Sequence, residues 1–385
     1  MADVELVTDV ESLDALAPEW DALAAASGLP QLSPAWVRAW WRHIAPDGAA
    51  PRTVAVRDGG RLIGLAPFYV EPAGGGRRDY RLPGIEIAAR LAPLALPDRE
   101  WEVAEAIGAA LCAAGPRPDA LRLEGIPIEG LWLTALRDGW PGALRPPLRL
   151  MNVDGNPLMS MSEPSFEDWL AGRSSNFRQQ MRRLRRRFAE AGGVSRVATR
   201  ETLAADAAAL TRLHALRWDG RGHSNLVDLD ERFSAFVVEL GERLLDDRRF
   251  ALRILELDGE PICAQLFVRA GGTTLFVNGG WDERHAALKP SLLCLLDAVQ
   301  EAFALGVERF DLGVGVQSYK LRFADGSAQL AWGVLMAPGA RFPLTAARTV
   351  PALAQARLRD GARRVLSEQQ VDKLRAARRR LRGAR

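Results

Sequence analysis

The sequence predicts a mixed α/β protein built from two successive halves, each a mixed central sheet flanked by helices, followed by a basic helical tail. Three observations indicate this class. The same order of elements, helices, hairpin, helix and strand, occurs twice along the chain. One segment has the pattern of a strand, a helix and a second strand. The length of 385 residues exceeds one ordinary domain, and 48% hydrophobic residues suffice for packed cores.

Each half is expected to start with helices and to continue with a β-hairpin. Asp58-Gly59 lies between apolar runs in residues 52–70, and Asp258-Gly259 does so in residues 251–269. Asp-Gly between two apolar runs is a strong hairpin signal. The other expected elements are helices 10–25, 36–44 and 100–114 and strand 120–124 in the first half, and helices 203–218, 231–245 and 291–305 and strand 307–312 in the second. Hairpins are common, so the shared order is the better evidence for a tandem duplication.

We divide the chain into a degenerate first domain at 1–150, a second domain with the site at 151–340 and a tail at 341–385. The first copy is chemically poorer, because its turn at residues 73–78 is Gly-rich and it has no counterpart of Tyr319-Lys320. The tail is dense in arginine, which is typical of a solvated helix face. A contact with a membrane surface or an acidic partner is the alternative.

Several classes of protein are excluded by composition. No apolar run approaches the ~18–20 residues of a membrane-spanning helix, and the acidic start lacks the pattern of a signal peptide. We therefore expect a cytoplasmic protein. Three cysteines without CxxC spacing and four scattered histidines without HExxH predict neither disulfides nor a metal site. Lysine occurs only at Lys289, Lys320 and Lys373, which is either chance or a sign of function at the first two.

The most informative segment combines a crossover with a polar loop. Thr273–Asn278 and Val307–Leu312 are expected strands, and Lys289-Pro290-Ser291 is expected to open the helix between them, since proline is favoured in the first helical turn. Such a crossover is right-handed and makes the strands parallel. It places a helix N-terminus, which binds phosphate well, beside the strand end. The segment therefore predicts an anion site next to the loop of Tyr319 and Lys320.

An arginine-rich helix is expected at residues 177–191, capped by Ser174-Ser175-Asn176. Its apolar stripe consists of Phe177, Met181, Leu184 and Phe188, and its other faces carry Arg178, Arg182, Arg183, Arg185, Arg186 and Arg187. Arg173 and Arg178 flank its start, where the helix dipole disfavours cations, so an anion there would relieve the conflict. The alternatives are a solvated arginine face and recognition of phosphate or carboxylate on a substrate, cofactor or carrier.

Further candidates lie at the end of helix 203–218 and after strand 307–312. His214 shares one face with Arg217 and Trp218 and is either structural or a proton acceptor at the cleft. His223 lies in a loop that could cover a site. Asp311, near a parallel strand end, could act as a base with a raised pKa or cap the following turn. Tyr319 could protonate a leaving thiolate or merely pack, and Lys320 could bind an anion or remain a surface charge. The chain has no GxSxG, Walker or Rossmann motif.

Three segments together resemble a known family. SSNFRQQMRRLRRRFAEAG, LHALRWDGRG and FDLGVGVQSYKLRF are similar to the GNAT-fold acetyltransferase domain of cellulose-biosynthesis acetyltransferases, which is related to the double-GNAT, Fem-type transferases. The resemblance extends from about residue 166 to residue 332 and reaches the first half only through element order. It implies tandem GNAT-like domains and an enzyme that uses acetyl-CoA or another acyl-CoA.

The resemblance also implies roles for residues. The CoA pyrophosphate would lie on the segment from Arg284 to Leu292, and pantetheine along the strand ending at Asn278. The implied cofactor-binding residues are Asn278, Gly279, Arg284, Leu288, Lys289, Pro290, Ser291 and Leu292. The chain departs from the family at Ser291, where a glycine is usual, and at Gln317, near which an acidic residue is usual.

A GNAT transferase acts mainly by holding amine and thioester together and by polarising the carbonyl with a backbone N–H. Asn278 and Gly279 would position the thioester, Asp311 or His214 would deprotonate the acceptor, and Tyr319 would protonate the thiolate. The expected substrate-binding residues are Arg178, Arg182, Arg217, Trp218 and Lys320.

Three functions remain open from the sequence. The first is acyl transfer to an amine or hydroxyl of a small molecule, sugar or polysaccharide precursor. The second is a Fem-like aminoacyl transfer from charged tRNA, which the arginine helix favours and the mild net charge of +3 opposes. The third is a catalytically silent module that acts as a partner in polysaccharide synthesis.

Overall fold

The computed structural model describes residues 2–73, 76–218, 229–315 and 317–365. Its strands form one continuous sheet in the order β1-β2-β3-β4-β6-β13-β7-β12-β11-β10-β9-β8, with β5 beside β3. The first half contributes β1 (Asp3–Val7), β2 (Ala50–Asp58), β3 (Arg61–Ala73), β4 (Arg77–Arg81), β5 (Leu94–Ala95), β6 (Ala120–Pro127) and β7 (Leu148–Ser160). The second contributes β8 (Val194–Val197), β9 (Phe250–Leu257), β10 (Glu260–Ala270), β11 (Thr273–Trp281), β12 (Arg309–Asp311) and β13 (Gly326–Met336).

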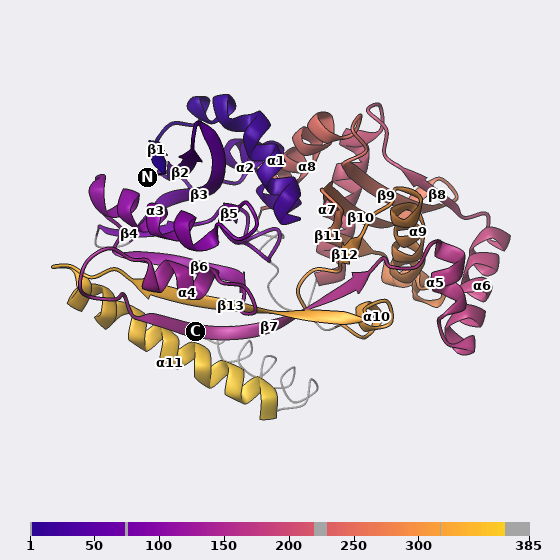
Figure 1. Cartoon of the computed structure of the whole chain (residues 1–385). Helices are drawn as coiled ribbons and strands as arrows, with labels where there is room; N and C mark the ends of the chain where they lie inside the picture. Colours follow the sequence, from indigo (N-terminus) through magenta and orange to yellow (C-terminus); the bar gives the residue numbers. More distant parts are fainter. Residues whose placement is uncertain (1, 74–75, 219–228, 316, 366–385) are drawn as a thin grey trace.

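Helices cover both faces of this sheet (Figure 1). In the first half they are α1 (Ala17–Ser27), α2 (Pro34–His43), α3 (Glu100–Ala113) and α4 (Trp132–Asp138), with short 3₁₀ turns η1 (Glu11–Leu16) and η2 (Pro30–Leu32). In the second they are α5 (Phe166–Ala171), α6 (Ser175–Glu190), α7 (Leu203–Trp218), α8 (Asp230–Leu244), η3 (Glu283–Leu288), α9 (Pro290–Ala304) and α10 (Ser318–Leu321). The tail begins with α11 (Phe342–Val365), and residues 366–385 lie outside the described part. The predicted mixed α/β fold with repeated halves is confirmed.

The repeat extends to the pairing of the strands. Each half contains an antiparallel hairpin, β2–β3 in the first and β9–β10 in the second. The next strand in each half pairs in parallel with the strand that follows a helix, β4 with β6 and β11 with β12. Both predicted hairpins exist. The second turns at Asp258-Gly259, whose φ angles of +51° and +77° suit a type I′ turn. The first turns one residue later than predicted, at Gly59-Gly60, because Asp58 pairs with Arg61.

The halves exchange their last strands. β7 follows β6 in the chain, yet it lies between β13 and β12, while β13, the last strand of the second half, lies between β6 and β7. In Figure 1 both strands run across the middle of the molecule and join its two sides. The domain boundary that we draw at residue 150 falls inside β7. The division into domains remains a prediction.

Local sequence signals account for the helices that cover the second half of the sheet. Ser174 Oγ accepts a hydrogen bond from the Phe177 N–H at 3.2 Å, which confirms the predicted cap of α6. The predicted stripe of α6 is buried in the same core as α9. Along β10, Cys263 and Phe267 belong to this core, whereas Ala264 and Leu266 belong to the core that contains α7 and α8. The alternation follows from the period of two residues in a strand.

The polar loop differs from expectation in one respect. Tyr319 and Lys320 lie in the short helix α10 rather than in a loop. The first part of the tail, α11, packs against β7 and β13. Among the described residues, no helix has the length and apolar character needed to cross a bilayer.

Candidate active site

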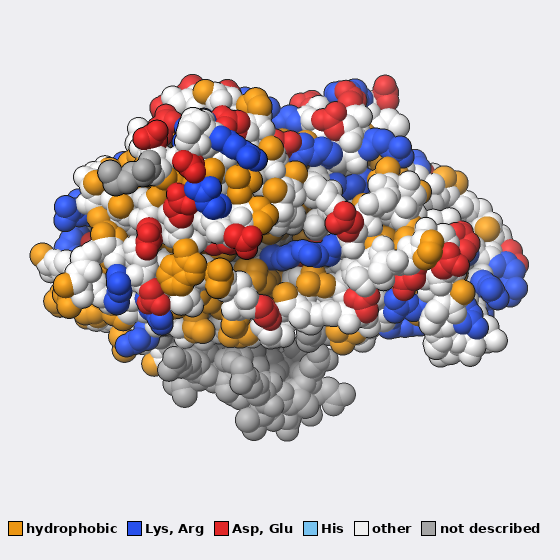
Figure 2. Space-filling view, in the orientation of Figure 1, with side chains coloured by type: hydrophobic (Ala, Val, Ile, Leu, Met, Phe, Trp, Pro, Cys, Tyr) orange, Lys and Arg blue, Asp and Glu red, His pale blue; other side chains and the backbone are white. Residues whose placement is uncertain are grey.

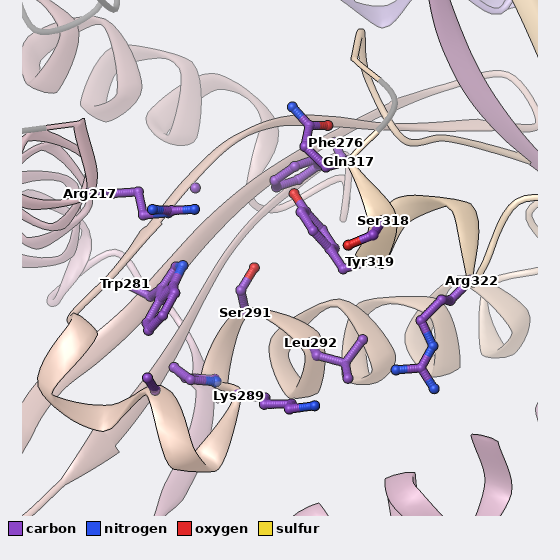
Figure 3. A pocket seen from close by; sticks show the side chains of 13 residues that line it. Arg217, Phe276, Trp281, Lys289, Ser291, Leu292, Gln317, Ser318, Tyr319 and Arg322 are labelled. Carbon is purple, nitrogen blue, oxygen red and sulfur yellow. The ribbon is translucent and has the colours of Figure 1, made fainter. Parts of the chain in front are cut away.

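The site lies where two parallel strands separate. Residues 273–275 of β11 pair with residues 309–311 of β12. Beyond Leu275, β11 continues to Trp281 without pairing with β12. A pocket of about 410 Å³ opens beyond the point of separation (Figure 3). It is lined by Arg217, Phe276, Gly279, Trp281, Ala286, Lys289, Pro290, Ser291, Leu292, Gln317, Ser318, Tyr319 and Arg322. Parts of α7, β11, η3, α9 and α10 therefore meet at one cavity.

The floor of the pocket includes the N-terminus of α9, as predicted. Lys289 is the N-cap residue in the left-handed conformation (φ +49°), and Pro290 occupies the first turn. The Lys289 side chain makes no capping hydrogen bond. Pro290 has no N–H, and the N–H groups of Lys289 and Leu292 already donate to main-chain carbonyls. This terminus can therefore offer an anion the Ser291 N–H and the positive end of the helix dipole. Gln265, buried on β10, donates from Nε2 to the carbonyl of Ser291 at 3.0 Å and to its Oγ at 2.9 Å, which fixes Ser291.

One wall carries the phenol of Tyr319. Figure 3 shows Tyr319 with Gln317 and Ser318 on one side of the pocket and Arg217 with Trp281 on the other. Burial raises the pKa of Tyr319 above its ordinary value, and its hydrogen bond with Ser291 only partly opposes this. The phenol therefore stays protonated at neutral pH and can donate a proton or a hydrogen bond into the cavity.

The charged side chains that line the pocket are all basic, namely Arg217, Lys289 and Arg322. Arg217 donates to Glu283 at 3.0 Å and lies 5.4 Å from the centre of the Trp281 ring. Arg322 lies 4.9 Å from the ring centre of Phe177 on α6. Because the described part of the lining includes no acidic side chain, it favours an anionic or electron-rich ligand.

Several predicted cofactor residues lie away from the cavity. Arg284 is 81% exposed and pairs with Asp282, so its guanidinium points to solvent and to its own segment. Asn278 and Leu288 are not among the lining residues, although Gly279 is. Lys289, Pro290, Ser291 and Leu292 line the pocket. Of the predicted CoA-binding segment, residues 284–292, mainly the C-terminal part lines the pocket.

At the start of the arginine-rich helix α6, main-chain carbonyl oxygens accept the hydrogen bonds of Arg178. Nη1 of Arg178 donates to the carbonyl oxygens of Ala171 and Arg173, so main-chain oxygens at the end of α5, not a bound anion, satisfy this cation. Arg182 is exposed on α6, outside the pocket lining. Arg178 and Arg182 are therefore not gathered at the cavity, whereas Arg217 is. The side chain of Trp218 and the whole of His223 lie outside the described residues.

Asp311 and Lys320 are buried behind the cavity rather than exposed in it. The carboxylate of Asp311 accepts hydrogen bonds from Arg90, Asn156 and the N–H of Gly313 at 2.9–3.1 Å. Lys320 is 5% exposed and donates from Nζ to two main-chain carbonyls, so it is neither a surface charge nor free to bind an anion. Burial lowers the pKa of Lys320 to about 8, and Asp311 opposes this shift.

His214 is buried on α7 against β11. Its Nδ1 lies 3.4 Å from the carbonyl oxygen of Gly279, which lines the pocket. Burial lowers the pKa of His214, and hydrogen bonds with Gly279 and Asn278 oppose this only in part. The imidazole is therefore neutral at physiological pH, which is the form that can accept a proton.

Six lining residues are not among the predicted site residues: Phe276, Trp281, Ala286, Gln317, Ser318 and Arg322. Each lies within three residues of a predicted site position, so proximity in the chain was the available signal. The sequence alone did not give the directions of their side chains, because these depend on where β11 ends and on the helical conformation of α10. Within the described residues, no cluster of His, Cys, Asp and Glu suits a metal ion.

Comparison with known proteins now adds to this geometry. Residues 175–321 match the family described as "Acetyltransferase (GNAT) domain". No curated protein matches the chain. Among solved structures, FemX superposes with a TM-score of 0.60 at 12% identity, covering 87% of this chain and 97% of FemX. The C-terminal domain of a putative lysylphosphatidylglycerol synthetase from Agrobacterium fabrum gives 0.51 at 11% identity, covering 86% and 94%.

A conserved protein of unknown function from Bacteroides thetaiotaomicron VPI-5482 gives a TM-score of 0.52 at 11% identity, covering 87% of this chain and all of that one. At such identities the likeness concerns the fold alone. The matched domain contains α6 and every described lining residue of the pocket except Arg322. The protein is an acyltransferase with a GNAT acetyltransferase domain in its second half. The cellulose-biosynthesis type, which the resemblance suggested, stays a prediction.

Proposed function

We propose that the protein transfers an acyl group from an acyl-CoA to an amine or hydroxyl. The observation that carries the proposal is the pocket between the separated strands β11 and β12, where an uncapped helix N-terminus faces a protonated tyrosine. A thioester donor with a pyrophosphate group needs both features. The acceptor that we propose is a small molecule, a sugar or a polysaccharide precursor.

The chemistry of the lining fits the parts of such a donor. For the pyrophosphate, the start of α9 supplies the Ser291 N–H and the positive end of the helix dipole, and Lys289 and Arg322 supply positive charge. Phe276 and Trp281 supply apolar surface for the pantetheine arm and the acyl chain. The fit thus depends on residues of three separate elements that meet only in the folded chain.

In the proposed reaction, the acceptor nitrogen or oxygen attacks the thioester carbon, a new C–N or C–O bond forms and the C–S bond breaks. Holding both reactants in one cavity supplies much of the acceleration. The acceptor loses one proton to a base, and the CoA thiolate gains one from Tyr319. Of the two predicted bases we favour His214, because its Nδ1 lies 3.4 Å from the carbonyl oxygen of the lining residue Gly279 and burial keeps its imidazole neutral. The carboxylate of Asp311, in contrast, is held by Arg90 and two further donors.

Thermal melting with ligands tests the donor assignment. Acetyl-CoA, longer acyl-CoAs and free CoA should each raise the melting temperature, because a ligand at 100 times its Kd stabilises the folded state by about 2.7 kcal/mol. Lys289→Ala and Arg322→Ala should lose most of the shift. Arg284→Ala is the matched control from the same segment and should keep it, because Arg284 points away from the cavity.

The chain-length preference in this assay would guide the choice of acceptors. An unshifted melting temperature with every CoA species would refute the donor assignment.

A tRNA-dependent transfer is the second candidate, and one observation favours it. The exposed arginines of α6 form a basic surface on the second half, visible toward the right of Figure 2, and α6 packs against η3 at the pocket. Salt-sensitive binding of charged tRNA without any response to CoA would favour this candidate, since phosphate contacts weaken steeply with salt.

A further inference from the structure

We propose that Arg90, a residue of the first half, positions the pocket helix α10 of the second half through the buried carboxylate of Asp311. Its catalytic consequence rests on the proposed function, whereas the contacts themselves do not. The sequence gives no hint of this link, because the first half is the copy without a Tyr-Lys segment and Arg90 lies 221 residues from Asp311.

The backbone around Arg90 is held firmly in place. Arg90 has a positive φ of +64°, which is strained for a residue with a side chain. Gln31 donates to its carbonyl oxygen at 2.6 Å, and Leu91 N–H donates to the carbonyl of Gly125 at 3.0 Å. A Cβ on Gly125 would lie only 3.0 Å from the Arg90 nitrogen. Strain of this kind persists where the surroundings dictate it, and it often marks a functional position.

The side chain of Arg90 crosses between the halves. Its Nη1 lies 3.1 Å from Oδ2 of Asp311, with 13% of the Arg90 side chain and 2% of the Asp311 side chain exposed. Asp311 Oδ1 accepts from Asn156 Nδ2 and from the Gly313 N–H, both at 2.9 Å. Asn156 belongs to β7, the exchanged strand. The carboxylate thus joins the first half, β7 and the turn that follows β12.

The next contacts lead from this turn to the pocket. Lys320 Nζ donates to the carbonyl oxygens of Gly313 at 3.2 Å and Val314 at 3.0 Å. It also lies 5.5 Å from the ring centre of Phe276, which lines the pocket. Lys320 is the neighbour of Tyr319 on α10. Hydrogen bonds thus connect Arg90 to Lys320 through Asp311 and the turn, and the last step to Tyr319 runs along the chain of α10.

Removal of the Arg90 guanidinium leaves the buried carboxylate with two neutral donors, and it leaves Lys320, whose own charge burial disfavours, as the neighbouring cation. Uncompensated buried charge is costly, and the turn and α10 can relieve it by opening toward water. If Arg90 only fastened the two halves, its loss would loosen the molecule broadly. If it positions α10, its removal destabilises chiefly the turn after β12 and α10.

Amide hydrogen exchange of the whole chain, without ligand, separates these two outcomes. The reporters are the N–H groups of Lys320, Phe323 and Ala324, which bond within the turn of α10, and the amides of α8 are the internal reference. In Arg90→Ala we expect the reporters to exchange about tenfold faster or more, since charge-assisted hydrogen bonds are among the stronger kinds. The α8 amides should change less than about twofold.

Arg99→Ala is the matched control, because it removes another arginine of the first half that pairs with an acid, Asp58, at the surface. It should leave the reporters unchanged, and Arg90→Lys should give an intermediate rate. Unchanged reporters in folded Arg90→Ala, or an equal rise at α8, would overturn the proposal. If Arg90→Ala does not fold, Arg90→Lys and Asp311→Asn decide by the same measurement.

The same variants carry a second readout if the donor assignment holds. Arg90→Ala should lower the turnover of acyl transfer more than it weakens acetyl-CoA binding, because Lys289 and the α9 terminus remain in place. Failure of the wild-type protein to bind acetyl-CoA would refute the proposed donor and leave the exchange result valid.

Discussion

At the scale of single residues, the chemistry depends on burial more than on residue type. Tyr319 and Lys320 are neighbours, yet one lines the cavity and the other lies behind it. Burial raises the pKa of the first and lowers the pKa of the second, because it disfavours the charged form of each. Each residue therefore gives a separate test.

Tyr319→Phe removes the proposed acid and keeps the ring. We expect turnover to fall about 100-fold or more, the size typical of general acid catalysis, with little change in acyl-CoA affinity. Steady-state kinetics and ligand-dependent melting measure the two effects. Tyr80→Phe, which removes the hydroxyl that donates to Pro116 at 2.7 Å in the first half, is the control. Turnover unchanged in Tyr319→Phe would remove the assignment.

Lys320 makes the stability of the fold depend on pH. Its pKa falls from 10.5 to about 8 in the folded state, so the unfolded chain binds the extra proton between these values. Stability should therefore rise with pH through this window, by roughly 3 kcal/mol in the limit of about 1.4 kcal/mol per pKa unit. Denaturant titrations from pH 7 to 10.5 measure this rise.

Lys320→Met should be less sensitive to pH over the same range. The difference between the two proteins isolates Lys320 from other titrating groups, and equal pH slopes would contradict the interpretation.

At the scale of elements, α7 approaches β11 closely and contributes Arg217 to the pocket. A Cβ on Gly280 would lie 2.2 Å from the main-chain nitrogen of His214, so only glycine permits this contact. Main-chain atoms cannot give way as a flexible side chain can. The position of His214 relative to Gly279 depends on the same approach.

Gly280→Ala should therefore push α7 away and destabilise the fold by about 1–3 kcal/mol, as overpacking does. Gly326→Ala is the control, since nothing lies within 4 Å of its added Cβ, and it should change stability by less than about 0.5 kcal/mol. Urea unfolding measures both variants. An equally small effect of Gly280→Ala would show that α7 can move freely.

At the scale of the whole molecule, the two halves form one structural unit. One hydrophobic core contains residues of both halves, among them Trp36 and Phe236, whose rings meet at 4.9 Å. β7 and β13 each pair with strands of the opposite half. Neither half can complete its sheet alone.

We accordingly expect a single cooperative unfolding transition, in which far-UV circular dichroism and tryptophan fluorescence coincide. The tryptophans report on both sides, because Trp20 and Trp40 are buried in the first half and Trp169 in the second. Two separate transitions, one seen mainly by fluorescence, would contradict the view of one cooperative unit.

The sequence by itself determined the features that depend on near neighbours in the chain. The two hairpins, the cap at Ser174, the buried stripe of α6 and the start of α9 at Pro290 follow from local backbone preferences and hydrophobic periodicity, although the first hairpin turns one residue later than Asp58-Gly59. They also placed Tyr319 near the helix N-terminus, because the crossover between β11 and β12 has one handedness.

Only the tertiary structure decided which side chains meet across long separations. It paired Asp311 with Arg90, buried Lys320, turned Arg178 toward main-chain carbonyls and exchanged β7 with β13. The physical reason is that periodicity shows which face of an element is apolar but not which element covers it. The burial of a charge, and hence its pKa and its role, depends on that second fact.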